Sequence, residues 1–576
     1  MRSRRGITLI ALVVTIIILI ILAGVSINVV LGENGIINMA KRAKEDMEIA
    51  VEEEQAKLDN LYMQMDDEAA YSEEEKVNVP MLLTGMRAIK FTDPEEDAEG
   101  EVIKTTSSDK EWYNYEAKKW ANSQTQDGSM WVWIPRYAYK ITYYTDDTKT
   151  TVSETKTSYS SIDVKFLIGK TDKYYKEDGT IGTAQRQKTV DETIDTTADY
   201  TVHPAFTNEK SINYANGGWR EELTGIWVAK FEAGYASGNN NAPVKASSVK
   251  YTEPRAWVSA TETKTSESRQ GARNWLDGIY SKIDENGTMT YGSTKYSWTN
   301  GEVAIKYPTF QGLTYSMNYI NNNDSYNISK VLTESGNIYG LSTSDADSHL
   351  IKNSEWGAVA YLSQSQYGLD GTNIYINNVS LNNSITSVYA VTGMAGSIEN
   401  AAEVTTTIKD INEGTVNNVY TWKEENGIKA STTGTIYGIY DFSGGLWERT
   451  ASFVSNGHAN LNSFGSSLLN GGENTEYTII YPSDDLGQAV VNTASEKNYE
   501  ANTKIYGDAV REISTKAIGT TLLNNDYLAF PGDKEPFLHR SGRYSDTWGA
   551  GLFYLYRTDG SSLYQAGFRT VLVAKY

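Results

Sequence analysis

The order of apolar and polar positions divides the chain into an N-terminal apolar run, an amphipathic segment and a long remainder of short strand-like runs. The apolar run extends from Ile7 to Leu31 without a charged residue. A helix needs about 20 such residues to span a bilayer, whereas the apolar part of a secretory signal has roughly 7–15. We therefore predict a transmembrane helix over residues 7–31. A buried core helix is the alternative interpretation.

The next segment predicts a second helix followed by a linker. Over residues 32–65, apolar side chains recur at steps of three and four, with lysines and glutamates between them, which is typical of an amphipathic helix. This stem either packs on another element or is a solvated charged helix. Residues 66–80 are acidic and poor in large apolar side chains, as linkers are.

The remainder, residues 81–576, predicts one large head rich in tyrosine, glycine, asparagine, serine and threonine. The runs "WVWIPRYAYKI" and "GIWVAKFEAGY" predict aromatic, alternating strands, and "AGFRTVLVAKY" predicts one C-terminal strand. The run "IYDFSGGLWERT" predicts a strand, a glycine turn and a strand, with Trp447 in the core. Polar stretches near residues 141–200 and 370–430 are interpreted as insertions.

Charge and composition narrow the classes of partner. The formal net charge is −21, so a nucleic-acid partner lacks the basic surface that normally attracts it. The chain has no cysteine, which excludes disulfides and thiol chemistry. Arg2, Arg4 and Arg5 precede the apolar run, and the positive-inside rule keeps that end in the cytoplasm. The head is then predicted to be extracellular.

Catalytic motifs are absent from the sequence. It has no HExxH, P-loop, GxSxG or EF-hand pattern. The four histidines, at positions 203, 349, 458 and 539, lack metal-ligand spacing. We predict that the protein is not an enzyme and has no resident cofactor.

The N-terminus resembles that of type IV prepilins. "RRG" followed by "ITLIALVVT" matches their basic leader, the glycine before the cut and the apolar start of the mature helix. The resemblance implies cleavage of a leader, residues 1–6, between Gly6 and Ile7 by a prepilin peptidase, and pilus subunits as further partners. Ala11 stands where filament-forming pilins usually have a glutamate, which argues against assembly in a filament core.

Five aromatic and glycine-rich motifs in the head, taken in order, resemble the formylglycine-generating-enzyme (sulfatase-modifying factor) family. They include "SEWGAVAYL" (354–362), Gly444-Gly445-Leu446-Trp447-Glu448-Arg449 and Gly567-Phe568-Arg569. The resemblance implies a C-type-lectin-like head, so the predicted fold class is α+β, with a long N-terminal transmembrane and stem helix before that head. Oxidase members bind copper through cysteines, which this chain lacks. Some members carry calcium near the central motif, where Glu448 is the candidate ligand.

The C-terminal pattern also resembles the variable region of ligand-binding proteins diversified by retroelements. That region is a face rich in tyrosine, serine, glycine and aspartate just before "GFR". The resemblance implies a ligand-binding face made of Arg540, Arg543, Tyr544, Asp546, Trp548, Tyr554, Tyr556, Arg557, Asp559 and Tyr564. Tyrosine, tryptophan and arginine are typical of recognition surfaces. Half of these side chains are alternatively core residues of the last hairpins, and alternation places Tyr554 and Tyr556 opposite Phe553 and Leu555.

The sequence as a whole predicts a pilin-like bacterial surface protein, anchored by a single membrane span, that displays a non-catalytic, lectin-like binding head. Its ligand is a surface protein or a glycan. A structural minor pilin and an enzyme with a cysteine-free site are the alternatives.

Overall fold

A computed structural model of the chain describes mostly β-structure. The described residues are Val77, 79–92, 101–187, 192–208, 217–235, 288–291, 294–297, 308–318, 320–378, 380–383, 387–396, 407–409, 415–417, 420–470, 475–483, 494–563 and 565–575. They belong to one compact unit, residues 64–576. Within them there are four α-helices: α4 (Asn322–Lys330), α5 (Asn353–Gln364), α6 (Ala459–Asn470) and α7 (Glu496–Ala501).

The predicted fold class is therefore wrong for the part of the chain that the structure describes. Sheets dominate there, and the longest α-helices, α5 and α6, have 12 residues each. The predicted localisation needs the same correction, because no helix in the described ranges has the length and apolar character to cross a bilayer. The leader (1–6), the apolar run (7–31), the stem (32–65) and residues 66–76 of the linker lie outside those ranges.

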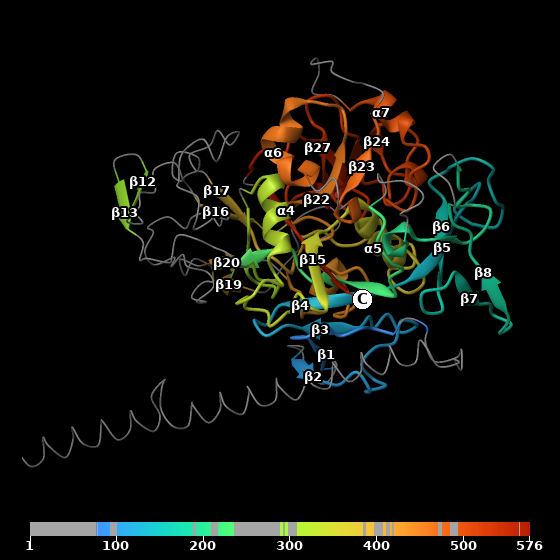
Figure 1. The fold of residues 1–576 in the computed structure, drawn as a ribbon, viewed down its shortest axis with the longest axis horizontal. Helices are drawn as coiled ribbons and strands as arrows, with labels where there is room; N and C mark the ends of the chain where they lie inside the picture. Colours follow the sequence, from blue (N-terminus) through green and yellow to red (C-terminus); the bar gives the residue numbers. More distant parts are fainter. Residues whose placement is uncertain are drawn as a thin grey trace, which may run out of the picture. The chain divides into compact units, whose positions relative to one another are not determined.

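The first large sheet is antiparallel and has seven strands (Figure 1). In spatial order they are β15 (Ala346–Leu350), β29 (Thr570–Ala574), β10 (Gly225–Ala229), β4 (Met130–Pro135), β3 (Asn122–Gln124), β1 (Arg87–Phe91) and β2 (Val102–Lys104). All six residues of β4 and all five of β10 are buried. The predicted alternation is therefore wrong for these two strands, because both of their faces are covered.

The second large sheet is mixed, and it lies with α6 and α7 in the orange and red part of Figure 1. Its strands are β23 (Ile479–Tyr481), β22 (Trp447–Val454), β26 (Phe537–Arg540), β27 (Leu555–Thr558), β25 (Tyr527–Ala529) and β24 (Ile518–Thr520), with β28 (Ala566–Phe568) paired to the start of β22. Strands β28 and β29 follow each other in the chain but join different sheets, so the single predicted C-terminal strand is two strands separated by Arg569.

Smaller sheets complete the architecture. A three-stranded sheet comprises β6 (Ser160–Phe166), β5 (Tyr137–Tyr143) and β9 (Thr201–Val202), and a hairpin, β7 (Lys173–Tyr175) with β8 (Ile181–Thr183), follows β6 in the chain. The remaining pairs are β11 (Gly234–Tyr235) with β14 (Tyr315–Ser316), β12 (Thr288–Tyr291) with β13 (Thr294–Ser297), β16 (Ser380–Asn383) with β17 (Ser387–Ala390), β18 (Met394–Ala395) with β21 (Tyr420–Thr421), and β19 (Thr407–Lys409) with β20 (Thr415–Asn417).

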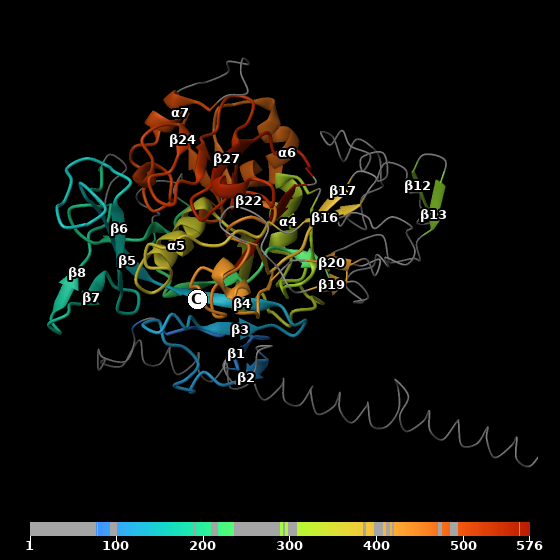
Figure 2. The same ribbon diagram turned by 180° about the vertical axis from the view of Figure 1, so that it is seen from behind.

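Helix α5 contains the "SEWGAVAYL" segment and packs against β22 and β6 (Figure 2). Its start is fixed by a capping box, in which the Glu355 carboxylate accepts a hydrogen bond from the backbone N–H of Lys352 at 2.8 Å. All 12 residues of the helix are buried. Gly357 allows this close packing, because a Cβ atom there would lie 2.0 Å from the carbonyl oxygen of Gly507.

The central motif departs from its prediction. Residues 439–446 form bends rather than a strand, and β22 begins only at Trp447. Asp441 has a φ of 61°, and its carboxylate accepts hydrogen bonds from Asn377 (2.8 Å) and from the backbone N–H of Gly393 (2.9 Å). These tertiary contacts hold the segment out of a strand conformation.

Candidate ligand-binding surface

Aromatic rings from neighbouring strands stack on one face of the second sheet. His539 of β26 pairs in register with Tyr556 of β27 on one side and with Arg449 of β22 on the other. Trp447 stands two residues before Arg449 and so shares its face. The Trp447 ring centre lies 5.4 Å from that of His539 and 5.8 Å from that of Tyr556, with interplanar angles of 20° and 7°. Cross-strand contacts of this kind stabilise the face that carries them.

Two further tyrosines extend the arrangement. The Tyr527 ring of β25 lies 6.0 Å from Tyr556, and the Tyr554 ring lies 6.5 Å from Tyr556. We call Trp447, His539, Tyr556, Tyr527 and Tyr554 the aromatic stack. Trp447, Tyr527 and Tyr556 are half-buried, whereas His539 and Tyr554 are buried.

Asp546 fixes the end of the stack formed by Trp447. Its Oδ2 accepts a hydrogen bond from Trp447 Nε1 at 2.7 Å, and its Oδ1 accepts one from Arg543 Nε at 2.9 Å. The Arg543 guanidinium carbon lies 4.4 Å from the centre of the Trp447 ring, within the range of a cation–π contact. Indole and guanidinium are thus held together by one carboxylate.

The predicted face divides into accessible and buried residues. Trp548, in the 3₁₀ turn Thr547–Gly549, is 54% exposed. Arg543, Tyr544, Asp546, Tyr556 and Asp559 are half-buried. Arg540, Tyr554 and Arg557 are buried, so these three are corrected to core positions. Tyr564 lies outside the described residues.

Each buried member of the predicted face has an internal role. Arg540 lies on the opposite face of β26 from His539 and donates to the carbonyl oxygens of Asp508 (3.4 Å) and Ala509 (3.3 Å). Arg557 Nε lies 2.5 Å from the Glu535 carboxylate. The Tyr554 ring stacks on that of Tyr556, in line with the predicted alternation. Tyr554 is nevertheless buried, whereas Tyr556 is half-buried.

The sequence interpretation missed Trp447, Tyr527 and His539 as parts of this surface. Trp447 was assigned to the core, and nothing near His539 or Tyr527 in the sequence marks them, because they meet only through strand pairing. Burial lowers the pKa of His539 well below its ordinary value, and the Arg449 charge adds to the effect. Neither ring nitrogen of His539 has a hydrogen-bond partner among the described residues. The ring therefore acts in the stack as a neutral aromatic.

Glu448, the candidate calcium ligand, is engaged by the chain itself. Its two carboxylate oxygens accept hydrogen bonds from Arg569 Nε (3.0 Å) and Nη2 (2.5 Å), and both side chains are fully buried. The described residues contain no group of three or more histidine, aspartate or glutamate side chains suited to a metal ion. Calcium binding at Glu448 stays a prediction.

A pocket of about 370 Å³ lies away from the stack and is lined by Trp219, Asp347, Glu476, Tyr477 and Lys575, among others. Asp347 accepts a hydrogen bond from the Tyr477 hydroxyl at 2.6 Å. Behind it, burial opposes the protonation of His349, but the carboxylates of Glu355 and Asp347 together raise its pKa. His349 Nδ1 and Asp347 Oδ1 lie 3.5 Å apart, and we assign the pocket no ligand.

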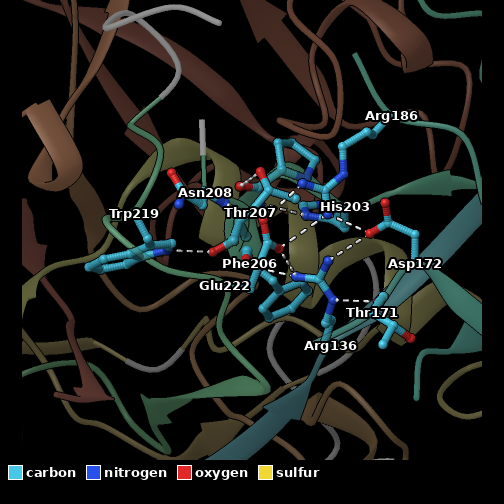
Figure 3. Close-up of polar contacts among 12 residues, drawn as sticks. Arg136, Thr171, Asp172, Arg186, His203, Phe206, Thr207, Asn208, Trp219 and Glu222 are labelled. Atoms are coloured by element: carbon cyan, nitrogen blue, oxygen red, sulfur yellow. Dashed lines mark hydrogen bonds and ion pairs between the residues drawn. The ribbon is translucent and has the colours of Figure 1, made fainter. Parts of the chain in front are cut away.

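A separate ion-pair cluster joins Arg136, between β4 and β5, to the segments after β6 and before β10 (Figure 3). Arg136 lies 3.1 Å from Asp172 and 2.6 Å from Glu222, and Arg186 contacts the same two carboxylates. Arg136 also donates to the carbonyl oxygens of Thr171 and Phe206 at 3.1 and 2.9 Å. The cluster is a structural crosslink, because every charged group in it is paired.

Comparison with known proteins adds no family: no family model and no curated protein matches the chain.

Proposed function

We propose that the head is a non-catalytic ligand-binding module whose contact surface is the exposed side of the aromatic stack with the loop beside it. We call Arg543, Tyr544, Asp546, Trp548 and Tyr556 the ligand face. The observation that carries the proposal is the aromatic stack with its half-buried Trp447 and Tyr556, together with Trp548, which is 54% exposed and stands two residues after the Asp546 that holds Trp447. An exposed tryptophan next to tyrosine and arginine is typical of interface hot spots.

Several hydrogen bonds hold the ligand face in place, which supports a role in recognition. The Tyr544 backbone N–H donates to the carbonyl oxygen of Gly445 at 2.9 Å, and Asp546 holds both Trp447 and Arg543. Side chains that are already ordered lose little conformational entropy on binding. The resemblance of the C-terminal pattern to diversified binding proteins points to the same function.

The non-catalytic part of the proposal rests on the chemistry of these groups. The Asp546 carboxylate, which anchors the stack, accepts hydrogen bonds from three donors, Trp447 Nε1 and the Nε and backbone N–H of Arg543. The stack's histidine is buried, neutral and covered by rings. Neither group is positioned as the accessible acid or base that general acid–base catalysis needs.

The test is a binding screen of the full-length chain on arrays of glycans and of peptides, followed by substitutions. For any ligand found, Trp548→Ala and Tyr556→Ala should each weaken binding at least tenfold, which corresponds to about 1.4 kcal/mol. Trp548→Ala should leave the melting temperature unchanged, because the side chain is mostly exposed.

Tyr159→Ala is the matched control, since Tyr159 is 41% exposed. It immediately precedes β6, which pairs with β5 and not with a strand of the second sheet. It should bind normally. Equal binding by all three variants, or an equal loss in the control, would refute the ligand face.

A further inference from the structure

Arg543 has donors that the protein itself does not use. A guanidinium carries five N–H donors in a fixed plane. The Nε–H of Arg543 donates to Asp546, and its backbone N–H donates to the same carboxylate at 3.2 Å. Its terminal nitrogens, Nη1 and Nη2, have no acceptor among the residues that the structure describes. The side chain is 26% exposed, so part of it is open to solvent.

Two other arginines of the same chain show which groups pair with a guanidinium in this protein. In the cluster of Figure 3, Arg136 and Arg186 each contact two carboxylates, those of Asp172 and Glu222. Arg543 has one carboxylate partner, Asp546, in an otherwise comparable ion pair. A second carboxylate on its Nη edge would complete the pattern that these two arginines already show.

We propose that Arg543 receives a carboxylate from the ligand through Nη1 and Nη2, and that the ligand is a protein presenting an aspartate or glutamate side chain. This inference rests on the proposed function of the ligand face. Asp546 on one edge and the Trp447 ring on one face fix the guanidinium plane. A fixed fork recognises a carboxylate with defined direction, which a lysine cannot reproduce.

The surroundings favour a protein over a sugar as the source of the carboxylate. The Arg543 guanidinium lies over the Trp447 ring, and Tyr544 and Trp548 stand close to Arg543 in the sequence; tyrosine and tryptophan are enriched with arginine in protein interfaces. Trp447 and Tyr556 are nearly parallel, and Arg543 already covers one face of Trp447, so that face is closed to a stacked sugar ring. The net charge of −21 repels a long acidic run, so we expect a single carboxylate in an otherwise neutral contact.

The experiment uses a microarray of random short peptides probed with the full-length chain. Peptides that bind should share an aspartate or glutamate at one position. Replacing this acidic residue of the peptide by asparagine or glutamine should weaken binding to the wild-type chain at least tenfold. The same replacement should weaken binding to the Arg543→Lys variant less than threefold, because that variant has already lost the bidentate contact. Arg220→Gln, which removes an arginine paired with Glu476 elsewhere, should keep the tenfold effect.

The outcomes separate this inference from the proposed function. Peptides that require Trp548 and Tyr556 but tolerate the amide substitution would overturn the carboxylate and leave the ligand face intact. Peptides that ignore Trp548 and Tyr556 would overturn both. An array with no binding peptide, together with binding of glucuronate but not glucose to the wild-type chain, would overturn the protein partner in favour of a sugar acid.

Discussion

Replacing Arg569 by methionine should destabilise the protein strongly, and more so at high pH. Arg569 is fully buried and makes four hydrogen bonds, two to Glu448 and one each to the carbonyl oxygens of Ala229 (2.7 Å) and Tyr440 (2.8 Å). Methionine fills similar space but leaves the Glu448 carboxylate and both carbonyls without their donor. Removing one partner of a buried ion pair costs about 3–5 kcal/mol.

The pH dependence follows from Glu448. Burial raises the pKa of Glu448 to about 7, although the charge of Arg569 opposes the shift. An acid whose pKa is raised by folding destabilises the fold as pH rises from its unfolded value toward its folded one. Without Arg569 the pKa of Glu448 in the folded variant rises further, so the variant keeps losing stability above pH 7. In the wild type, the loss of stability caused by Glu448 levels off at that pH. The gap between the two proteins should therefore grow by about 2 kcal/mol between pH 6 and pH 8.5.

The assay is urea denaturation followed by tryptophan fluorescence at both pH values, with the double variant Arg569→Met/Glu448→Leu alongside. The double variant removes both charges, so it should recover at least half of the lost stability and show no widening gap. A loss below about 1 kcal/mol at pH 8.5, or a gap that is equal at the two pH values, would refute the reasoning.

Three further substitutions test other parts of the structure. Phe568→Ala should cost about 3–5 kcal/mol in the same assay, because the ring is fully buried; a loss below that range would place it at the surface. Burial lowers the pKa of His203 to about 3, so below pH 6.5 the unfolded chain binds a proton at His203 and the folded chain does not. The free energy of unfolding of the wild type relative to His203→Gln should therefore fall by about 2 kcal/mol from pH 7.5 to pH 5. A difference that is constant over this range would contradict the prediction. Arg136→Met should cost about 2–3 kcal/mol, because its partners are only partly buried, and hydrogen exchange should accelerate in residues 171–187 but not in β22.

Local patterns in the sequence predicted individual elements better than their assembly. The strands β4 and β10 are confirmed, since long aromatic runs between turn residues have few other solutions. The division of "WVWIPRYAYKI" into strands of two different sheets was not predictable, because it depends on Arg136 meeting carboxylates from residues 172 and 222. The overall fold class was wrong for the described residues.

The ligand face shows a similar limit. Alternation correctly placed Tyr556 opposite Leu555, since both lie on strand β27. It could not separate Arg540 from Arg543, because Arg540 ends a strand on its inner face and Arg543 begins a loop held by Asp546. Trp447 and His539 become neighbours only through pairing of β22 with β26, which are separated by more than 80 residues of sequence. No local pattern contains that information.

The position of strand β29 has a consequence for how the protein is made. This strand, Thr570–Ala574, lies between β10, which ends at Ala229, and β15, which ends at Leu350. A ribosome adds about 5–20 residues per second, so β10 waits on the order of tens of seconds for its neighbour to be synthesised. During that time the nascent chain exposes two strand edges, that of the apolar β10 and that of β15, whose partner on that side in the finished sheet is β29. Such edges are targets for holding chaperones, and overexpression without them should favour aggregation during translation.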